Sequence, residues 1–550
     1  MTDNWDERYD AVVVGSGAAG LTAAIIGARR GMKMLVIEKA AVWGGTSAWS
    51  GGGVWAPANR LQKAAGIKDS VEEAAKFLDE VVTDEGLATS PERRMAYLRG
   101  APEMVDVLIE EGMGWTADRK HPDYLSDRKH AGIGRDLDSQ FFDAKRLGAW
   151  RKTMRRGPAP YAIRLKDIQG IAQGISSVRS LSRMAFIFFR QKLMTALGQD
   201  PVGCGESLVA QLMAIAQRRG VEFRLNTPLV ELVSDEGGIT GVVTGGEAGQ
   251  RRIGARAGVL LSAGGFAHGA YREKVMGMTG RWSSASPDDT GDIVQMAMGI
   301  GAMTSMLDEA WWGSAFVYPG DVPVFCQWER SLPFSIVVDS AGKRFCDEAE
   351  DYYSFGQSLI AHGIDQAWLI MDARHRKRYT FGGFFPGHTP KAMFEHDFFR
   401  TADTLDGIAE VCGIDPAGLR ATVARFNTFV DKGVDEDFRR GGEPYDRYWG
   451  DPTIKPNPNL GKIEQGPFLA TRVYLGDLGT KGGYVTDADA QVLNLEGHPI
   501  EGLYAAGNST ASVMGRSYPG PGVTLGPAMT FGYLAMEHAA RRMANRPITA

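Results

Sequence analysis

Short apolar runs that end in glycine-rich turns mark the start of the chain. Residues 11–14 are four consecutive apolar residues, and residues 15–20 read Gly-Ser-Gly-Ala-Ala-Gly. Helical residues follow to Arg30, Gly31 ends that helix, and a second apolar run covers residues 34–37. A continuous apolar run that leads into glycine is typical of a strand buried on both faces. The pattern therefore predicts a complete β-turn-α-β unit.

The glycine spacing of this unit is that of a dinucleotide-binding turn. Gly15 allows a tight turn, Gly17 lets the backbone approach a pyrophosphate, and Gly20 lets the helix pack on the strand. The helix N-terminus offers N–H donors and a partial positive charge to phosphates. Glu38 follows the second strand, where a carboxylate binds ribose hydroxyls. Because strand, helix, second strand and acid are all present, the motif strongly predicts a nucleotide site.

The βα rhythm changes in the middle of the chain, between about 311 and 467. Residues 334–345 predict a hairpin around a turn at 340–342, residues 404–430 are helical in pattern, and residues 440–460 form an irregular connection rich in Gly, Pro, Asp and Asn. We expect this part to be a second domain that covers the nucleotide site.

Charge and composition narrow the class of protein. The chain has 550 residues, 44% of them hydrophobic, and a net charge of −5, which argues against a nucleic-acid-binding protein. Its four cysteines show no CxxC spacing, so we expect reduced thiols rather than a metal or redox site. The N-terminus lacks an apolar signal segment, and no apolar run reaches the ~18 residues that span a bilayer. We therefore expect a cytoplasmic protein.

One segment, residues 151–199, departs from this acidic background. From Arg151 to Lys192 there are ten Lys or Arg and a single acid, Asp167, and the segment contains the apolar stretch "SRMAFIFFRQKLM". A basic and apolar segment suits an anionic membrane surface, and residues 180–197 would be its docking part. The alternative is a solvated helical excursion that packs on the domain.

Four further stretches resemble the fumarate reductase and succinate dehydrogenase flavoprotein superfamily. They are "WGGTSAWSGGGVW" (43–55), "GVLLSAGGFAHG" (258–269), "TGDIVQMAMGIGA" (290–302) and "IEGLYAAGNSTASVMG" (500–515). The resemblance implies an α/β fold with a discontinuous Rossmann-type FAD-binding domain and an inserted α+β catalytic cap domain. We expect residues 1–310 and 468–550 to form the FAD-binding domain, with the basic insertion at 151–199, and residues 311–467 to form the cap.

The resemblance also implies which residues contact FAD. They lie in the first turn, after the second strand, in the stretch 43–55, and in the later turns toward the C-terminus. These residues are Gly15, Gly17, Ala18, Ala19, Gly20, Glu38, Lys39, Gly44, Gly45, Thr46, Ser47, Gly51, Gly52, Gly53, Ala263, Gly264, Asp292, Gly507, Asn508, Gly522, Val523 and Thr524.

Within that superfamily, residues 476–535 closely resemble the C-terminal region of 3-ketosteroid Δ1-dehydrogenases. The distinctive part is "SYPGPGVTLGPAMTFG" (517–532), supported by residues 121–148 and 342–356. The implied reaction removes hydrogens from C1 and C2 of a 3-ketosteroid. Polarising the C3 carbonyl makes the C2 hydrogen acidic enough to leave, which needs donors aimed at the carbonyl oxygen. The implied acceptor of the electrons is a quinone or an electron-transfer protein.

The family motifs assign roles to four residues. Tyr518 O–H and Gly522 N–H match the pair that binds the carbonyl oxygen, Tyr352 matches the base that takes the C2 proton, and Tyr124 matches its helper. The C1 hydride then goes to flavin N5, and no metal is required. Tyr353 is the alternative to Tyr352 as base. The acids at 350 and 351 depart from the family pattern, and negative neighbours raise the pKa of a phenol.

Three other functions stay open at this stage. A Δ4-(5α)-dehydrogenase would remove hydrogens from C4 and C5 on the same scaffold. A fumarate reductase-type enzyme fits less well, because its flavin strand ends in "AGE" where this chain has Ala506-Gly507-Asn508. It also carries a histidine where this chain has residues 478–481 without one. A non-catalytic flavin- or lipid-binding protein is suggested by residues 151–199.

Overall fold

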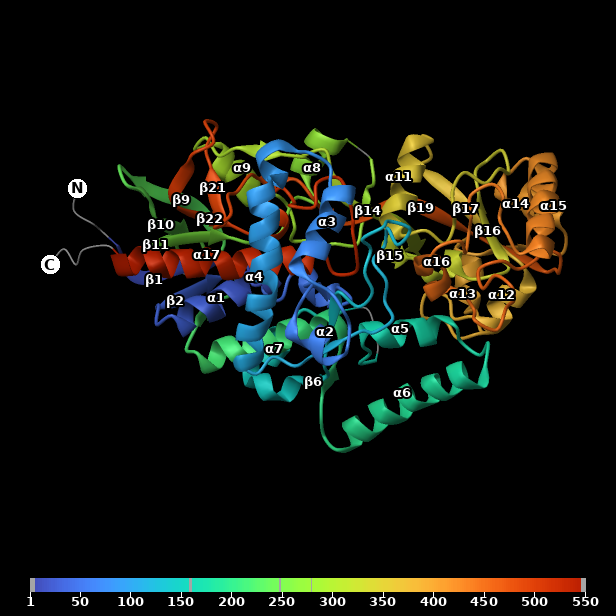
Figure 1. Cartoon of the computed structure of the whole chain (residues 1–550), viewed down its shortest axis with the longest axis horizontal. Coiled ribbons are helices and arrows are strands. Elements are labelled where there is room, and N and C mark those ends of the chain that lie inside the picture. The colour runs from blue at the N-terminus through green and yellow to red at the C-terminus, as the bar shows by residue number, and fades with distance from the viewer. Residues whose placement is uncertain (1–4, 158–160, 247–248, 278, 546–550) are drawn as a thin grey trace.

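The computed structural model describes residues 5–157, 161–246, 249–277 and 279–545. Parts of the predicted ranges 1–310, 151–199 and 468–550 therefore lie outside the described residues. The described chain builds two large sheets, with the nucleotide-binding motif on one and the middle of the chain on the other (Figure 1).

The first sheet is mostly parallel and contains the predicted β-turn-α-β unit. Its strands lie in the order β21-β22-β11-β1-β2-β8, and β10 and β9 extend it through β11. All neighbours from β22 to β8 pair in parallel, whereas β21, β10 and β9 pair antiparallel. The strands are β1 (Glu7–Val14), β2 (Met34–Ile37), β8 (Glu222–Arg224), β9 (Leu229–Asp235), β10 (Gly238–Thr244), β11 (Arg251–Leu261), β21 (Gln491–Leu493) and β22 (Pro499–Ala505).

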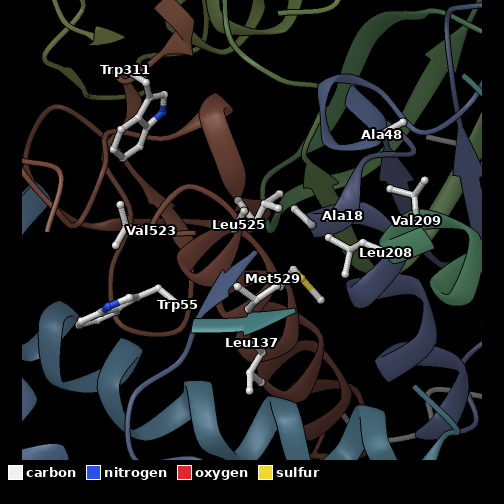
Figure 2. Close-up of a cluster of buried hydrophobic side chains, with 14 of the residues drawn as sticks. Ala18, Ala48, Trp55, Leu137, Leu208, Val209, Trp311, Val523, Leu525 and Met529 are labelled. Atoms are coloured by element: carbon white, nitrogen blue, oxygen red, sulfur yellow. The ribbon is translucent and has the colours of Figure 1, made fainter. Parts of the chain in front are cut away.

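Helices from both ends of the chain pack together beside this sheet. The last helix lies against the first helix, against α4 and against β11 (Figure 1). Ala18, Leu208 and Leu525 come from three of these helices and meet in one buried cluster (Figure 2). Residues from the C-terminal part of the chain thus pack on the nucleotide-binding unit. The helices are α1 (Ala18–Arg29), α4 (Pro91–Glu110), α7 (Cys204–Arg218) and α17 (Leu525–Asn545).

The second sheet has the order β15-β14-β19-β17-β16, with β12 and β18 paired to β19. Its central strand β19 lies beyond the boundary at residue 467 that the sequence suggested, because it pairs with β14 and β17. The predicted hairpin at 334–345 is wrong in one half: the turn forms, but the residues after it make no strand. The strands are β12 (Trp282–Ser283), β14 (Ala310–Tyr318), β15 (Val322–Cys326), β16 (Ser335–Val338), β17 (Gln366–Met371), β18 (Arg400–Ala402) and β19 (Phe468–Thr480).

Helices also accompany the second sheet. The predicted helical stretch 404–430 is two helices, α14 and α15, which pack with β16, β17 and β19 in one core. The helices of this part are α10 (Trp328–Ser331), α11 (Tyr352–Ala361), α12 (Ala373–Arg378), α13 (Lys391–Glu395), α14 (Leu405–Cys412), α15 (Pro416–Lys432) and α16 (Pro444–Trp449).

The remaining elements are shorter, and some form small separate sheets. They are α2 (Arg60–Ala64), α3 (Val71–Val81), α8 (Ala270–Met276), α9 (Asp292–Met298), β3 (Val54–Trp55), β4 (Trp115–Ala117), β5 (Asp136–Ser139), β6 (Phe142–Asp143), β7 (Pro201–Val202), β13 (Thr304–Ser305), β20 (Gly483–Tyr484) and the 3-10 turns η1 (Thr46–Trp49), η2 (Gly86–Thr89), η3 (Ala144–Thr153) and η4 (Gly507–Ser509).

The basic segment forms two helices, α5 (Leu165–Ala172) and α6 (Val178–Ala196). The start of α5 is held by Asp138, whose carboxylate accepts the N–H of Leu165 at 3.2 Å. Its end reaches the second sheet's part of the molecule, where Gln173 Nε2 donates to the carbonyl oxygen of Gly450 at 3.0 Å. The long helix α6 stands out below the rest of the molecule (Figure 1).

Candidate active site

The residues predicted to contact FAD gather at one edge of the first sheet. Four parallel strands, β1, β2, β11 and β22, end there, and ligands of such sheets bind at the carboxyl ends of the strands. The residues that follow these strands are Gly15, Gly17, Ala18, Ala19, Gly20, Glu38, Lys39, Ala263, Gly264, Gly507 and Asn508. The remaining predicted residues come from loops and from the residues before α17.

The turn between β1 and α1 leaves the N-terminus of α1 open to a ligand. Gly15 has a φ of +100°, and a Cβ there would lie 2.5 Å from the carbonyl oxygen of Ser262, so only glycine fits. A Cβ at Gly17 would meet only the Ser47 hydroxyl, at 3.4 Å, and no side chain of Gly17 can cap the helix. Ser47 Oγ accepts the N–H of Ala18. This cradle fits the pyrophosphate of a dinucleotide.

Acidic and basic side chains line the same edge. Glu38 Oε2 accepts hydrogen bonds from the N–H and the hydroxyl of Ser16, at 3.1 and 2.7 Å. Lys39 and Asp292, both predicted to contact FAD, form an ion pair with 2.6 Å between Nζ and Oδ2. The sequence placed these two residues in one site, and the structure brings them together at the start of α9.

The predicted stretch 43–55 folds against the first turn and α7. The Gly44 N–H donates to the Ser16 hydroxyl at 3.0 Å, and the Thr46 hydroxyl accepts the N–H of Ser286 at 2.9 Å. A Cβ at Gly52 would lie 2.5 Å from the carbonyl carbon of Cys204. Gly52 is thus needed for contact between backbone segments of the protein itself.

A small cavity lies between the N-terminus of α17 and β14. It is lined by Trp311, Lys481, Asn508, Val523 and Thr524, among others. Trp311 Nε1 donates to Asn508 Oδ1 at 3.1 Å, and Figure 2 shows Trp311 and Val523 on the same side of the buried cluster. Three of these residues are predicted to contact FAD, so the cavity joins the cofactor site to the second sheet.

The Pro-Gly-Pro-Gly turn before α17 is fixed by its neighbours. Gly522 has a φ of +87°, and a Cβ there would lie 2.5 Å from the carbonyl oxygen of Gly53. From the sequence we expected Gly522 to let the backbone approach a ligand closely. In the structure, the missing side chain of Gly522 makes room for the backbone of Gly53. Pro519 accepts the N–H of Tyr124 on its carbonyl oxygen at 2.9 Å. The turn therefore positions Tyr518 and Tyr124 together.

Three of the predicted catalytic residues form one cluster of buried phenols. The rings of Tyr124 and Tyr518 stack, with centroids 5.2 Å apart and an interplanar angle of 15°. The Tyr352 ring meets both edge-on, at 5.3 Å from Tyr124 and 4.9 Å from Tyr518. Tyr124 Oη donates to Tyr352 Oη at 3.3 Å. These side chains come from positions hundreds of residues apart, and the fold brings them into direct contact.

Tyr353, the alternative to Tyr352, faces another group. Its hydroxyl donates to Glu309 Oε1 at 3.4 Å, and its ring lies 6.2 Å from that of Tyr518. Tyr352 is the first residue of α11, and its ring is enclosed by Tyr124, Tyr518 and Phe325. The geometry therefore favours Tyr352 over Tyr353 as the partner of Tyr124.

Burial dominates the ionisation of the three phenols. It raises the pKa of Tyr518 to about 12. Burial, followed by the neighbouring phenols, raises the pKa of Tyr352 well above its usual value of 10, and burial does the same for Tyr124. Taking a phenolate out of water is costly unless the charge finds a partner. The cluster by itself keeps its phenols protonated, which suits a hydrogen-bond donor.

The acids that precede Tyr352 are tied into the start of α11. Asp351 caps this helix, accepting the N–H groups of Tyr353 and Ser354 at 2.9 and 3.0 Å. Burial is the main reason why the pKa of Tyr518 is raised. Hydrogen bonds with Tyr352 and Thr524 lower this pKa, and the charge of Asp351 raises it further. Burial raises the pKa of Glu350 well above its usual range, which reduces its charge. The charge of Asp351 thus raises the pKa of Tyr518 and of Tyr124. At Tyr352, for which the sequence predicted such an effect, the leading causes are burial and the neighbouring phenols.

Sequence reasoning missed several residues that contact the cluster. Trp311 meets Tyr518 edge-on at 5.2 Å, Tyr445 lies 4.8 Å from Tyr124, and Phe325 lies 4.6 Å from Tyr352. No motif marks these aromatic residues, since a single sequence does not tell a wall of a site from a core residue. Lys481 lies in a stretch noted only because it lacks a histidine.

The fold and the cradle define a flavin-binding protein, and a family model described as "FAD binding domain" matches residues 10–525. FAD, predicted from the sequence, is therefore confirmed as the cofactor. The chain is 38% identical to a 3-oxosteroid 1-dehydrogenase of Mycolicibacterium smegmatis, over 98% of this chain and 99% of the relative. The chain belongs to the 3-oxosteroid 1-dehydrogenase family, within the fumarate reductase and succinate dehydrogenase flavoprotein superfamily.

Two further comparisons define this relationship. The crystal structure of a 3-ketosteroid Δ1-dehydrogenase from Sterolibacterium denitrificans, in complex with 1,4-androstadiene-3,17-dione, is 36% identical and superposes with a TM-score of 0.92, covering 98% of this chain and 100% of that chain. A 4-oxocyclohexanecarboxylate 2-dehydrogenase of Sinomonas cyclohexanicum is 35% identical over 96% of this chain and 92% of the relative. The family resemblance seen in the sequence is confirmed, and the protein is an FAD-dependent oxidoreductase.

Proposed function

We propose that the protein catalyses the FAD-dependent 1,2-dehydrogenation of 3-ketosteroids. The observation that carries this proposal is the contact of Tyr124, Tyr352 and Tyr518 in one buried cluster beside the cofactor edge. It agrees with the names of the relatives, several of which are 3-oxosteroid 1-dehydrogenases. The substrate would reach the site between the two parts expected from the sequence, the FAD-binding part (residues 1–310 and 468–550) and the cap (residues 311–467). We move residues 468–480 to the cap, because β19 pairs with its strands.

Each residue of the cluster has a distinct task in this proposal. Tyr518, with its pKa raised to about 12, stays protonated and donates to the C3 carbonyl oxygen. The Gly522 N–H is the second donor, and no backbone oxygen of the described residues accepts it. Polarising the carbonyl acidifies the C2 hydrogen, because the charge that develops on oxygen is stabilised.

Tyr352 takes the C2 proton, and Tyr124 holds the Tyr352 oxygen through their hydrogen bond. The base must be a phenolate, and its raised pKa means that only a small fraction is available at neutral pH. When bound, FAD supplies the acceptor for the C1 hydride. For the electrons that leave the enzyme we propose a quinone or an electron-transfer protein, since the sequence shows a single dinucleotide-binding motif.

Product analysis tests this function. The enzyme is incubated with androst-4-ene-3,17-dione and an artificial electron acceptor, and in parallel with a saturated 5α-3-ketosteroid. We expect a new double bond at C1–C2 from both. A bond formed only at C4–C5 of the saturated steroid would instead assign the Δ4-(5α) reaction. Turnover of 4-oxocyclohexanecarboxylate without turnover of any steroid would assign the substrate class of the Sinomonas relative.

Anaerobic flavin absorbance separates catalysis from passive binding. A 3-ketosteroid should bleach the flavin band near 450 nm in the holoenzyme. Absence of bleaching with every steroid tried would favour a non-catalytic flavin- or lipid-binding protein.

We also propose that α6 docks on an anionic membrane surface, so that the enzyme is peripheral to the inner face of the membrane. The side chains that carry this are large, apolar and more than 45% exposed: Val178 at 85%, Leu181 at 52%, Phe186 at 61%, Phe189 at 65%, Leu193 at 47% and Leu197 at 70%. Cations accompany them at Arg179, Arg183 and Lys192. An apolar face with flanking cations is the pattern of an interfacial helix.

No helix among the described residues is long and apolar enough to span a bilayer. Deleting residues 180–197 tests the docking of α6. We expect the deleted enzyme to lose its binding to vesicles of anionic lipid while it retains FAD. Unchanged partitioning of the deleted form would end this proposal, and it would leave the dehydrogenation proposal intact.

A further inference from the structure

One lysine lies fully buried beside the tyrosine cluster. The Lys481 side chain is 0% exposed, and its Nζ donates to the carbonyl oxygen of Ser517, the residue before Tyr518, at 2.5 Å. Ser517 is the one hydrogen-bond acceptor that the described residues give to Nζ. The ammonium lies 4.4 Å from the centroid of a Trp311 ring and 4.3 Å from that of Tyr353.

Lys481 is linked to Tyr518 through three residues that it contacts, Ser517, Trp311 and Tyr353. The hydrogen bond holds the backbone next to Tyr518, and the two rings that flank the ammonium, those of Trp311 and Tyr353, both meet the Tyr518 ring. Cation–π contacts strengthen when both partners are removed from water. Lys481 therefore fixes the environment of the residue that we assign to the C3 carbonyl.

Lys481 also lines the cavity between the two sheets. It shares this cavity with Asn508, Val523 and Thr524, which come from the FAD-binding part of the chain. The charged groups that act on it are Glu309, Arg516, Glu85 and Asp351. Of these, Glu309 is engaged by Arg516, with 2.9 Å between Oε2 and Nη1. No ion pair within 4 Å neutralises the Lys481 ammonium among the described residues.

We propose that Lys481 is a positioning residue that holds the Tyr518 turn and places a positive charge beside the flavin, and that this charge sets the redox potential of the bound cofactor. Reduction brings negative charge into a site that excludes water, where a nearby cation is worth more than in solution. The lysine then favours reduced flavin, which draws the hydride transfer forward.

The protonation of Lys481 makes this role measurable through the pH dependence of the flavin potential. Burial lowers the pKa of Lys481 to about 7, although the charge of Glu309 acts to raise it. Negative charge on reduced flavin stabilises the ammonium, so reduction raises its pKa. Between the two values the protein takes up an additional proton on reduction. A side chain with a structural role alone would not couple to the flavin in this way.

The test measures the midpoint potential of FAD in the holoenzyme, anaerobically and without steroid, so it does not depend on the proposed substrate. In Lys481→Met at pH 6 we expect the equilibrium to shift roughly tenfold toward oxidised flavin, a drop of about 30 mV for a two-electron couple. Lys481→Arg should stay near the wild-type potential. Lys391→Met, which removes an exposed lysine of α13, is the control and should change nothing.

The pH dependence supplies a second measurement that needs no destabilised variant. From pH 6 through the range just above pH 7 the wild-type potential should fall by about 30 mV in total more than that of Lys481→Arg, because proton uptake by the lysine is coupled to the two-electron reduction. Parallel pH profiles for the two proteins would overturn the proposal. So would a Lys481→Met enzyme that folds, binds FAD and keeps the wild-type potential at pH 6.

Discussion

The tyrosine cluster and helix α6 break the usual distribution of side chains in opposite ways. The cluster buries three phenols, with Tyr352 and Tyr518 only 4% and 3% exposed. Helix α6 leaves aromatic rings in water, with Phe186 and Phe189 more than 60% exposed. Buried polar groups and exposed apolar patches are the informative deviations in a protein. In our proposals the first deviation belongs to the catalytic site and the second to a membrane-docking surface.

The two regions should respond differently to mutation. In the cluster each oxygen has one position, set by ring contacts on several sides, so the loss of a single oxygen removes a complete function. On α6 the binding energy scales with apolar area, so each side chain contributes a share. Substitutions in the cluster should therefore change rates by orders of magnitude, and those on α6 should change partitioning stepwise.

The largest effect is expected from the base. Tyr352→Phe should lower kcat on a 3-ketosteroid by roughly 10²–10⁴-fold, because a general base is lost. Tyr353→Phe, its neighbour with a hydroxyl that faces Glu309, is the matched control and should lose less than about tenfold. Uptake of deuterium at C2 in heavy water, followed by NMR, reports the same step. Equal losses in both variants would contradict the assignment.

The carbonyl donor comes next. Tyr518→Phe should lower kcat by roughly 10²–10³-fold, the usual cost of removing one donor at a developing negative charge. The flavin spectrum should be unchanged, since the ring stays in place between Tyr124 and Trp311. If kcat falls less than about threefold, the carbonyl oxygen is held by another group.

The pH profile sharpens the same assignment. In the proposed mechanism Tyr352 acts as a phenolate, and its pKa is raised above 10, so kcat/KM should rise with pH, about tenfold per unit. The rise continues through the neutral and mildly alkaline range, since Tyr518, with a pKa of about 12, keeps its proton there. Stopped-flow flavin reduction between pH 6 and 10 measures this directly. A rate that falls as pH rises would assign the essential group to an acid.

The smallest effects belong to α6. Phe186→Ser and Phe189→Ser should each weaken binding to anionic vesicles several-fold, and together roughly the product of the two, because each removes a share of apolar area. Leu495→Ser, which changes an apolar side chain 70% exposed elsewhere, is the control. Turnover of a steroid dissolved in water should not change. Vesicle sedimentation measures the binding. If the Phe186→Ser and Phe189→Ser variants bind vesicles as well as Leu495→Ser does, docking through α6 is contradicted.

The two sheets differ in how well the sequence predicts them. The β1-α1-β2 unit is predictable because its glycines have local reasons: the φ of +100° at Gly15 is a property of the turn itself. Residues 468–480 were expected in the FAD-binding part, whereas β19 pairs with β14 and β17 of the second sheet. These pairings are long-range contacts, which a local pattern does not reveal. The failed hairpin at 334–345 has the same cause, since β16 pairs with β17 rather than with the residues after its turn.

The candidate site shows the same limit. Tyr124, Tyr352 and Tyr518 were predicted from motifs, and the fold brings them together. Trp311 contacts the Tyr518 ring, and Lys481 donates to the carbonyl oxygen of Ser517, the residue before Tyr518; no local pattern records either contact. The reason for Gly522 was also hidden, because Gly53, the residue that excludes a side chain there, is far away in sequence.

Helix α5 has a mechanical consequence for the whole enzyme. One end is hydrogen-bonded to Asp138 of β5 and the other to Gly450, which follows α16. Helix α5 therefore bridges these two parts of the molecule. Any relative motion of Asp138 and Gly450 must carry α5 along or break one of these hydrogen bonds. Because α5 also packs on α6, a surface that binds α6 would be linked through α5 to both of these points.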